Sequence, residues 1–361
     1  MTQVELESSY KIKTKIGSGS FGRVFDAVNS ITGEEVAIKI ENKKSDHQQL
    51  LYEGSMYRCL YEKDLHPEGI PKVYKCTSQS DYNILIMELL GLSLEDLFNI
   101  CGRKFSLKTV LLLADQMLKR IEYVHRCGLV HRDIKPENFV MGVGKNQDTL
   151  YIIDFGLAKH YMKDGKHAEC MKGKKLVGTV RYASIHTHQG LSQSRRDDLE
   201  SIGYVLIYLL KGSLPWQGIT AQHKQLRYEK VKAKKIESLV ANLCQGVPDE
   251  FAQYLNYVKN LKFDETPDYQ KLLHLFRNLY IQKGFKEDFE YDWKSKQSDL
   301  DTITNDSRHQ LELTREEPRV INTHANLNLL VDNRLKKYQK SPSGDKGVKA
   351  KACISIFNCF A

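Results

Sequence analysis

The sequence predicts an α+β protein of two lobes, in which an N-terminal antiparallel sheet with one main helix precedes a mainly helical lobe. Between residues 10 and 88, short apolar segments separated by turn residues indicate strands. After residue 91, apolar residues recur every three or four positions, which indicates amphipathic helices. With 361 residues, the chain is long enough for each lobe to bury its own core.

Composition places the chain among ordinary soluble proteins, with 41% hydrophobic and 27% charged residues. No apolar run reaches the roughly 18 residues of a membrane span, and Met1–Glu7 lacks the regions of a signal peptide. We therefore expect a cytoplasmic or nuclear protein. The eight cysteines form no CxxC pair, so we expect buried thiols, no disulfides and no structural metal.

The net charge of +9 indicates attraction to anions, although solubility alone would also explain it. No zinc finger, RNA-binding signature or basic stripe with interleaved aromatic residues supports a nucleic-acid partner.

Residues 10–41 predict three strands joined by a glycine turn and a hairpin. The turn follows the pattern GxGxxGxV, in which glycines let backbone N–H groups approach phosphate oxygens. A dinucleotide-binding turn has the same glycines but leads into a helix, whereas Val24–Val28 continues as a strand. The pattern therefore favours a flap over nucleotide phosphates, with these expected contacts: Ile16, Gly17, Ser18, Gly19, Ser20, Phe21, Gly22 and Val24.

The third strand, Glu35–Glu41, alternates so that Ala37 and Lys39 share one face. A small residue beside a lysine suits an adenine ceiling with a cation that reaches the phosphates. An exposed edge lysine is the alternative, and an acidic partner distinguishes the two. Glu53, in the helix predicted over Gln48–Leu60, is the candidate partner.

Two further strands are predicted over Val73–Tyr82 and Asn83–Glu88, followed by a hinge at 88–91. Backbone groups from Glu88 to Leu90 would bond the adenine edge, and Met87 would guard the deeper part of the pocket. Without the neighbouring motifs, the second segment would be only a buried strand.

The first long helix of the second lobe begins after Ser106, a favourable N-cap, and ends at Cys127 and Gly128. It delivers the chain to Val130–Asn138, where Asp133 is the candidate to accept the proton of an attacking hydroxyl. Lys135 would stabilise the transferred phosphoryl group, and Asn138 and Asp154 would bind Mg²⁺.

Each of these residues could individually be a surface charge, but their order resembles the protein kinase superfamily. The resemblance implies a bilobal protein-kinase fold that binds ATP and Mg²⁺, with Lys39 and Glu53 paired in the active state. Lys135, two residues after the predicted base, matches Ser/Thr kinases. The predicted divisions are a leader (1–9), a kinase domain (10–293; N-lobe 10–87, hinge 88–91, C-lobe 92–293) and a tail (294–361).

Further segments resemble the casein kinase 1 family: Glu88–Phe98, Arg103–Met117, Gly178–Ser184, Gln193–Ser201, Gly212–Gly218 and Phe276–Tyr280. His186 departs from that family, which typically has asparagine there. Asp198 matches the aspartate that braces the catalytic loop. A non-specific Ser/Thr protein kinase is therefore expected, and a kinase-fold scaffold that acts through binding is the alternative. A scaffold would lack Lys39, Asp133, Asn138 or Asp154, and all four are present.

Between Asp154 and Gly178 there is no serine or threonine, so a switch by Ser/Thr phosphorylation within this span is unavailable. The span holds six lysines against two acids, which a solvated basic loop would explain. The resemblance implies more specifically that Lys174, Arg181 and Arg227 form an anion site. Such a site would select acidic or already phosphorylated protein substrates.

The tail combines seven Lys/Arg between Arg334 and Lys351 with Cys353 and Cys359 among apolar residues. S-acylation beside a basic segment would make it a peripheral membrane anchor. A partly disordered tail, with a short helix over 322–338, and a segment that folds back on the domain are the alternatives. We expect the protein to be a monomer.

Overall fold

The computed structural model describes residues 9–19, 22–45, 48–79 and 81–296. Apart from Ser9, they belong to a unit that spans Tyr10–Pro318, and residues 1–8 and 297–361 lie outside the described residues. The predicted tail helix and both tail cysteines therefore also lie outside them.

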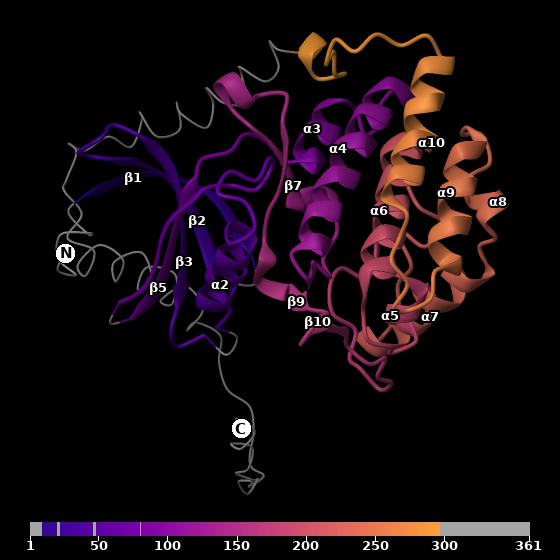
Figure 1. Ribbon diagram of the computed structural model, residues 1–361, viewed down its shortest axis with the longest axis horizontal. Helices are drawn as coiled ribbons and strands as arrows, with labels where there is room; N and C mark the ends of the chain where they lie inside the picture. The colour runs from indigo at the N-terminus through magenta and orange to yellow at the C-terminus, as the bar shows by residue number, and fades with distance from the viewer. Residues whose placement is uncertain (1–8, 20–21, 46–47, 80, 297–361) are drawn as a thin grey trace, which may run out of the picture. The chain divides into compact units, whose positions relative to one another are not determined.

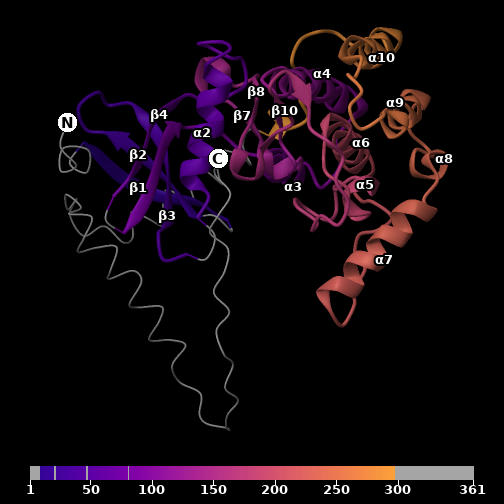
Figure 2. The same cartoon turned by 60° about the horizontal axis from the view of Figure 1, so that its bottom comes forward.

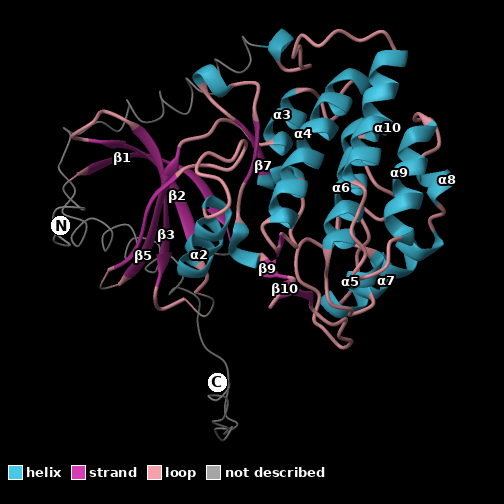
Figure 3. Cartoon of the chain, viewed as in Figure 1, coloured by secondary structure: helices cyan, strands magenta, loops and turns pink. Residues whose placement is uncertain are grey.

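The N-terminal part is an antiparallel sheet of five strands in the order β1-β2-β3-β5-β4 (Figures 1 and 3). The strands are β1 (Tyr10–Gly19), β2 (Gly22–Asn29), β3 (Glu35–Asn42), β4 (Val73–Ser78) and β5 (Tyr82–Glu88). In β3 the face predicted from alternation is confirmed, because Ala37 and Lys39 face a cavity while Val36 and Ile38 are buried elsewhere. The register pairs Ala37 with Met87, which brings the predicted hinge beside the predicted cation strand.

The prediction of one strand over Val73–Tyr82 is wrong at its end. β4 stops at Ser78, and the Gln79 N–H donates to the Tyr82 carbonyl over 2.8 Å, closing a hairpin. Polar residues at 79–81 favour this turn over a longer strand. Helix α2 (Leu50–Tyr61) packs against β4 and β5 and begins two residues later than predicted.

The second part is mainly helical (Figures 1 and 3). Its long helices are α4 (Leu107–Arg126), α6 (Arg195–Lys211), α7 (Lys224–Glu237), α9 (Asp249–Asn260) and α10 (Tyr269–Gln282), and its short ones are α3 (Leu94–Ile100), α5 (Ile185–His188) and α8 (Val240–Leu243). α6 is buried along most of its length and packs between α4 and α9. Figure 2 shows α7 extending away from the other helices, beside α5.

The predicted boundaries of α4 are confirmed. The Ser106 hydroxyl accepts from the Thr109 N–H over 3.2 Å, and Gly128 has a φ of 79° directly after the last turn. The N-terminal end also receives a residue from far along the chain, because the Asp292 carboxylate accepts from the Ser106 N–H over 2.6 Å. Tyr291 and Trp293 stack beside it with ring centroids 4.5 Å apart.

Three small two-stranded sheets carry the loops of the site. They are β6 (Leu129–Val130) with β9 (Lys159–His160), β7 (Phe139–Met141) with β8 (Leu150–Ile152), and β10 (Met162–Lys163) with β11 (Lys166–His167). Short 3-10 turns occupy η1 (Pro136–Asn138), η2 (Gly144–Asn146), η3 (Phe155–Leu157) and η4 (Lys294–Lys296).

The six described cysteines are free thiols. Cys127 and Cys244 are buried, but Cys170 is exposed, so the prediction of buried thiols is wrong there. Cys170 lies in the basic loop, where few apolar residues can cover it. Within the described ranges, no helix is both long and apolar enough to cross a bilayer.

Candidate active site

A cavity of about 620 Å³ is lined by the sheet, the 88–93 connection and the loops that follow α4. Its lining contains most of the residues predicted to bind nucleotide: Ile16, Gly17, Gly22, Val24, Ala37, Lys39, Met87, Glu88 and Leu90. Ser18 and Gly19 end β1, and Ser20 and Phe21 lie outside the described residues. Residues of β1, β2, β3 and β5 thus line one cavity.

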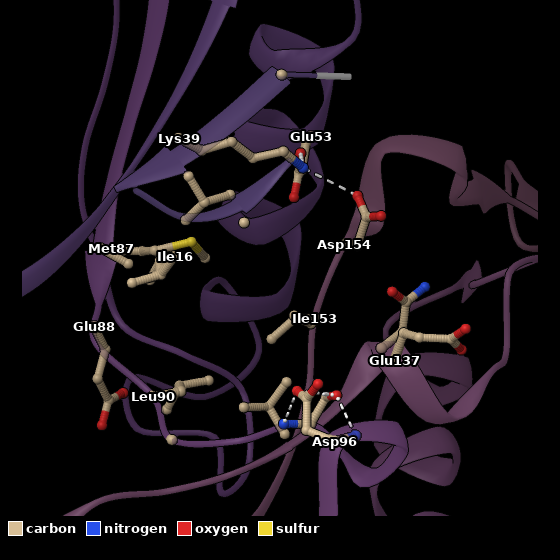
Figure 4. Close-up of a pocket in the computed structure, with 18 of the residues that line it drawn as sticks. Ile16, Lys39, Glu53, Met87, Glu88, Leu90, Asp96, Glu137, Ile153 and Asp154 are labelled. Carbon is tan, nitrogen blue, oxygen red and sulfur yellow. Dashed lines mark hydrogen bonds and ion pairs between the residues drawn. The ribbon is translucent and has the colours of Figure 1, made fainter. Parts of the chain in front are cut away.

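At one end of this cavity, three charged side chains converge (Figure 4). Lys39 Nζ lies 2.6 Å from Glu53 Oε2 and 3.1 Å from Asp154 Oδ1. Burial works against the charged ammonium, but the two carboxylates raise the pKa of Lys39 above its usual value. Lys39, whose side chain is 12% exposed, is therefore a part-buried cation with an acidic partner, as predicted, and not an exposed edge lysine.

The N-terminus of α2 is held by an acid from β3 that sequence reasoning missed. Glu41 Oε1 accepts from the N–H groups of Gln49 and Leu50 over 2.6 and 3.2 Å, and Oε2 accepts from Asn83. A carboxylate is favourable at a helix N-terminus, where N–H groups lack partners. Glu41 follows Lys39 by two residues, so one strand positions both the cation and the helix that carries its partner.

Two tyrosines of α2 contact the chain around Asp154. The Tyr52 hydroxyl donates to the Ala158 carbonyl over 2.8 Å, and the Asp154 N–H lies 3.4 Å from the Tyr57 hydroxyl. Asp154 has a φ of 69°, a conformation that non-glycine residues seldom adopt. The strand predicted to end at Asp154 is shorter in the structure, because β8 ends at Ile152. α2 and the segment after Asp154 therefore fix each other.

Asp133 is buried beside the cavity, 6% exposed, with hydrogen-bond and ionic partners on both carboxylate oxygens. Lys135 Nζ lies 2.8 Å from Oδ2, and the Thr179 hydroxyl donates to Oδ1 over 2.7 Å. The Asn138 amide donates to the Asp133 carbonyl over 2.8 Å. Lys135, Asn138 and Asp154 line the cavity, so the predicted residues are brought together. Thr179 was missed because it lies 46 residues from Asp133.

The loop that carries Asp133 is braced from α6. Asp198 accepts from the N–H groups of His131 and Arg132 over 2.7 and 2.8 Å and contacts His125. Burial opposes its charge, but the hydrogen bonds from His125 and the backbone lower the pKa of Asp198. The structural role expected for Asp198 matches these contacts.

The basic loop is the lysine-rich span between Asp154 and Gly178. Near its start, the Leu157 carbonyl accepts a hydrogen bond from Arg132 Nε over 2.7 Å. Burial lowers the pKa of Lys159, and the nearby charges of Arg132 and Lys174 lower it further. The charges of Arg132 and of Lys174, near the end of the loop, therefore both act on Lys159 at its start.

The three residues of the predicted anion site do not line one cavity. Lys174 lines a second cavity of about 700 Å³, together with Lys175, Lys224 and Lys232. The Arg181 guanidinium instead lies over the rings of Tyr182 and Tyr208, 5.6 Å from each centroid. Arg227 is exposed on α7 and is not in the lining of that cavity. Sequence reasoning missed Lys224 and Lys232, because only the packing of α7 against the basic loop brings them there.

A family model, the protein kinase domain, matches residues 10–274. The match covers the five strands, both cavities and the helices through the first turns of α10. It confirms the bilobal fold predicted from the strand and helix patterns. The domain implies a protein kinase that uses ATP and a divalent metal ion.

Proposed function

The chain belongs to the protein kinase domain family, and on this premise we propose that it is a Ser/Thr kinase of casein kinase 1 type. It transfers the γ-phosphate of Mg-ATP to Ser or Thr in acidic or already phosphorylated protein segments. The segments that resemble casein kinase 1, and Lys135 beside the base, support this narrower assignment.

The observation that carries the proposal is the buried carboxylate of Asp133, with Thr179 on one oxygen and Lys135, which lines the cavity, on the other. A target hydroxyl that approaches Asp133 can pass its proton to this carboxylate as it attacks. Lys135 then balances the negative charge that develops on the transferred group.

The cavity fits the nucleotide and the metal ion. Val24, Ala37 and Leu90 provide apolar surfaces for adenine, and the 88–90 backbone lies at its edge. Asp154 and Asn138 offer a carboxylate and an amide oxygen, the hard ligands that Mg²⁺ prefers. When bound, the metal neutralises phosphate charge, and Lys39 adds a protonated ammonium held in place by Glu53.

We also propose that the enzyme needs no phosphorylation of its basic loop. The Lys39–Glu53 ion pair is formed, and Arg132 donates a hydrogen bond to the Leu157 carbonyl. Leu157 belongs to the span between Asp154 and Gly178, which contains no Ser or Thr that could be phosphorylated. Treatment with a broad Ser/Thr phosphatase, followed by its removal, should leave kcat unchanged. A loss of activity that returns on incubation with ATP would contradict this proposal.

The test of activity is phosphate transfer from Mg-ATP to casein, an acidic protein. The wild type should transfer phosphate to Ser and Thr, and Asp154→Asn should abolish transfer. Peptides with Ser or Tyr at the target position test the residue preference. Binding of casein without transfer by the wild type would favour the scaffold instead.

Selection of acidic or primed substrates is tested at the basic residues. A charge-assisted hydrogen bond to phosphate contributes roughly 1.5–3 kcal/mol. We therefore expect the ratio of kcat/KM for a primed over an unprimed peptide to fall about tenfold or more in Lys174→Ala. Arg181→Ala and Arg227→Ala test the other two predicted anion residues separately. Equal kcat/KM for both peptides in the wild type would contradict the selectivity.

For the tail, we propose a peripheral membrane contact through Cys353 and Cys359, with cytoplasmic and nuclear pools, in a monomeric enzyme. Fractionation of cells that express wild type or Cys353→Ser/Cys359→Ser should show a shift to the soluble fraction in the variant. An unchanged distribution would remove the membrane contact.

A further inference from the structure

Lys235, near the end of α7, is a lysine buried to 1% exposure with no role in the chemistry described above. Its Nζ donates to the carbonyls of Val180 and Ala183 over 3.0 and 2.5 Å. Burial lowers the pKa of Lys235 to about 7, and the charge of Glu200 offsets this only in part, because that carboxylate accepts from the Ile185 N–H and the Tyr204 hydroxyl. The ammonium is thus directed at backbone carbonyls.

The surroundings of the ammonium are aromatic. Lys235 Nζ lies 5.0 Å from the ring centroid of Tyr204 and 5.1 Å from that of Trp216, within the range of cation–π attraction. The Trp216 indole N–H donates to the Arg181 carbonyl over 2.7 Å. Lys235 and Trp216 together therefore hold three carbonyls within the four residues Val180–Ala183, which we call the anchored segment.

The anchored segment follows directly on a contact with Asp133. Thr179, whose hydroxyl donates to Asp133, precedes Val180. Gly178, just before it, runs so close to the Arg132 carbonyl that a Cβ there would lie 2.2 Å from the oxygen. A target hydroxyl must reach Asp133, so a protein substrate has to pass along this stretch of backbone.

We propose that Lys235 is a positioning residue for the protein substrate, which together with Trp216 holds the anchored segment so that Thr179 stays against Asp133. The inference rests on the kinase activity proposed above. Without the Lys235 amino group, the Val180 and Ala183 carbonyls would lose this donor and the segment would shift towards other partners. Displacements of about 1 Å near reacting groups can reduce rates on the order of a hundredfold.

The decisive variant is Lys235→Met, which keeps the unbranched apolar stem and removes the donor. The matched control is Lys234→Met, because Lys234 is the exposed neighbour on the same helix turn. We measure kcat and KM for an acidic Ser peptide, KM for Mg-ATP, and the melting temperature of each full-length variant. Lys235→Met should lower peptide kcat/KM on the order of tenfold or more, while KM for Mg-ATP stays within about twofold. Lys234→Met should match the wild type.

Two further variants keep the proposal testable if Lys235→Met does not fold. Trp216→Phe removes the indole donor to Arg181 but keeps a ring, and it should cause the same selective loss. In a double-mutant cycle, adding Thr179→Val to either variant should cost much less than in the wild type, because both act through the same contact.

Unchanged peptide kcat/KM in a folded Lys235→Met or Trp216→Phe would overturn the positioning role alone. A fall in apparent kcat that matches the unfolded fraction of the enzyme, with KM for the peptide unchanged, would overturn it as well. Additive effects with Thr179→Val would do the same. Absence of phosphate transfer by the wild type would overturn both this inference and the proposed function.

Discussion

At the scale of single residues, Gly178 passes close to the backbone of Arg132, the residue before the proposed base Asp133. Its φ is 94°, and a Cβ would lie 2.2 Å from the Arg132 carbonyl oxygen. Gly178→Ala should therefore displace the loop that carries Asp133, lower stability by roughly 1–3 kcal/mol and lower kcat about tenfold or more. Steady-state kinetics and thermal melting provide the measurement.

Gly165→Ala is the control for that substitution. Gly165 also has a positive φ, 74°, but a Cβ there would meet no atom within 4 Å. It should lose about 1 kcal/mol of stability while kcat is kept. Equal kcat in the two variants would show that the close approach at Gly178 does not matter for catalysis.

His188 is a second residue whose environment leads to a prediction. Burial, with a smaller effect of the Lys235 charge, lowers the pKa of His188 to about 4. Between about pH 6.5 and 4, His188 is therefore protonated in the unfolded chain but neutral in the folded chain. The free energy of unfolding consequently decreases as the pH falls through this window. Relative to His188→Gln, the wild type should lose at most about 3 kcal/mol across this window.

The comparison between variants is necessary because another buried group acts with the opposite sign. Burial raises the pKa of Asp197 to about 7, so its contribution to stability increases as pH falls from 7 towards 4. Urea unfolding of both proteins at pH 7.5 and at pH 5 isolates the histidine. If the wild type and His188→Gln differ by the same free energy of unfolding at pH 7.5 and at pH 5, the lowered pKa of His188 is contradicted.

Sequence reasoning was most successful where the participating residues are neighbours in the chain. Asp133, Lys135 and Asn138 lie within six residues, so one loop conformation brings them together. Asp198, which is distant in the chain, was expected only through the family resemblance, whereas Thr179 and Lys235 are ordinary polar residues until the helices pack. No local pattern distinguishes Lys235 from the exposed Lys234 beside it.

At the scale of elements, α2 is the part whose position decides whether Lys39 has its partner. Its first turn is capped from β3 by Glu41 and not by the preceding Gln49. Glu41→Gln removes the charge from these hydrogen bonds, which should cost about 1–3 kcal/mol of stability. We expect a several-fold increase in KM for Mg-ATP, because Glu53 would hold Lys39 less firmly.

The control on the same helix is Glu62→Gln, an exposed acid directly after the last turn of α2. It should leave KM for Mg-ATP and the melting temperature unchanged. If Glu41→Gln behaves like Glu62→Gln in both measurements, the cap from β3 does not position α2.

Periodicity predicted the strands, α2 and α4 because alternating or three-to-four spacing reflects one buried face of each element. It could not predict how α7 packs. This helix is highly charged, and its buried residues are Val231 and Lys235. Packing also decides where the three residues of the predicted anion site lie: they are on separate segments and do not line one cavity, and the Arg181 guanidinium lies over two tyrosine rings.

At the scale of the whole molecule, the packed unit extends beyond the residues that match the family. The match stops at residue 274, inside α10, whereas Tyr280, Tyr291 and Trp293 are buried farther along. A chain that ends after residue 274 should not unfold cooperatively, since it loses part of α10 and the aromatic residues against α4. A chain that ends after residue 296 should melt close to the full-length protein. Circular dichroism on both proteins is the measurement, and a stable shorter chain would contradict this prediction.

The contact of Asp292 with the first turn of α4 also has a consequence for biosynthesis. On the ribosome, the sheet of β1 to β5 is translated early and can begin to pack before the rest exists. The start of α4, the helix that leads to Asp133, gains its contact with the Asp292 carboxylate only after another 186 residues have been translated. The complete domain therefore assembles only after Asp292 has been translated, so a nascent chain stalled before that point would carry the nucleotide flap without a finished catalytic loop.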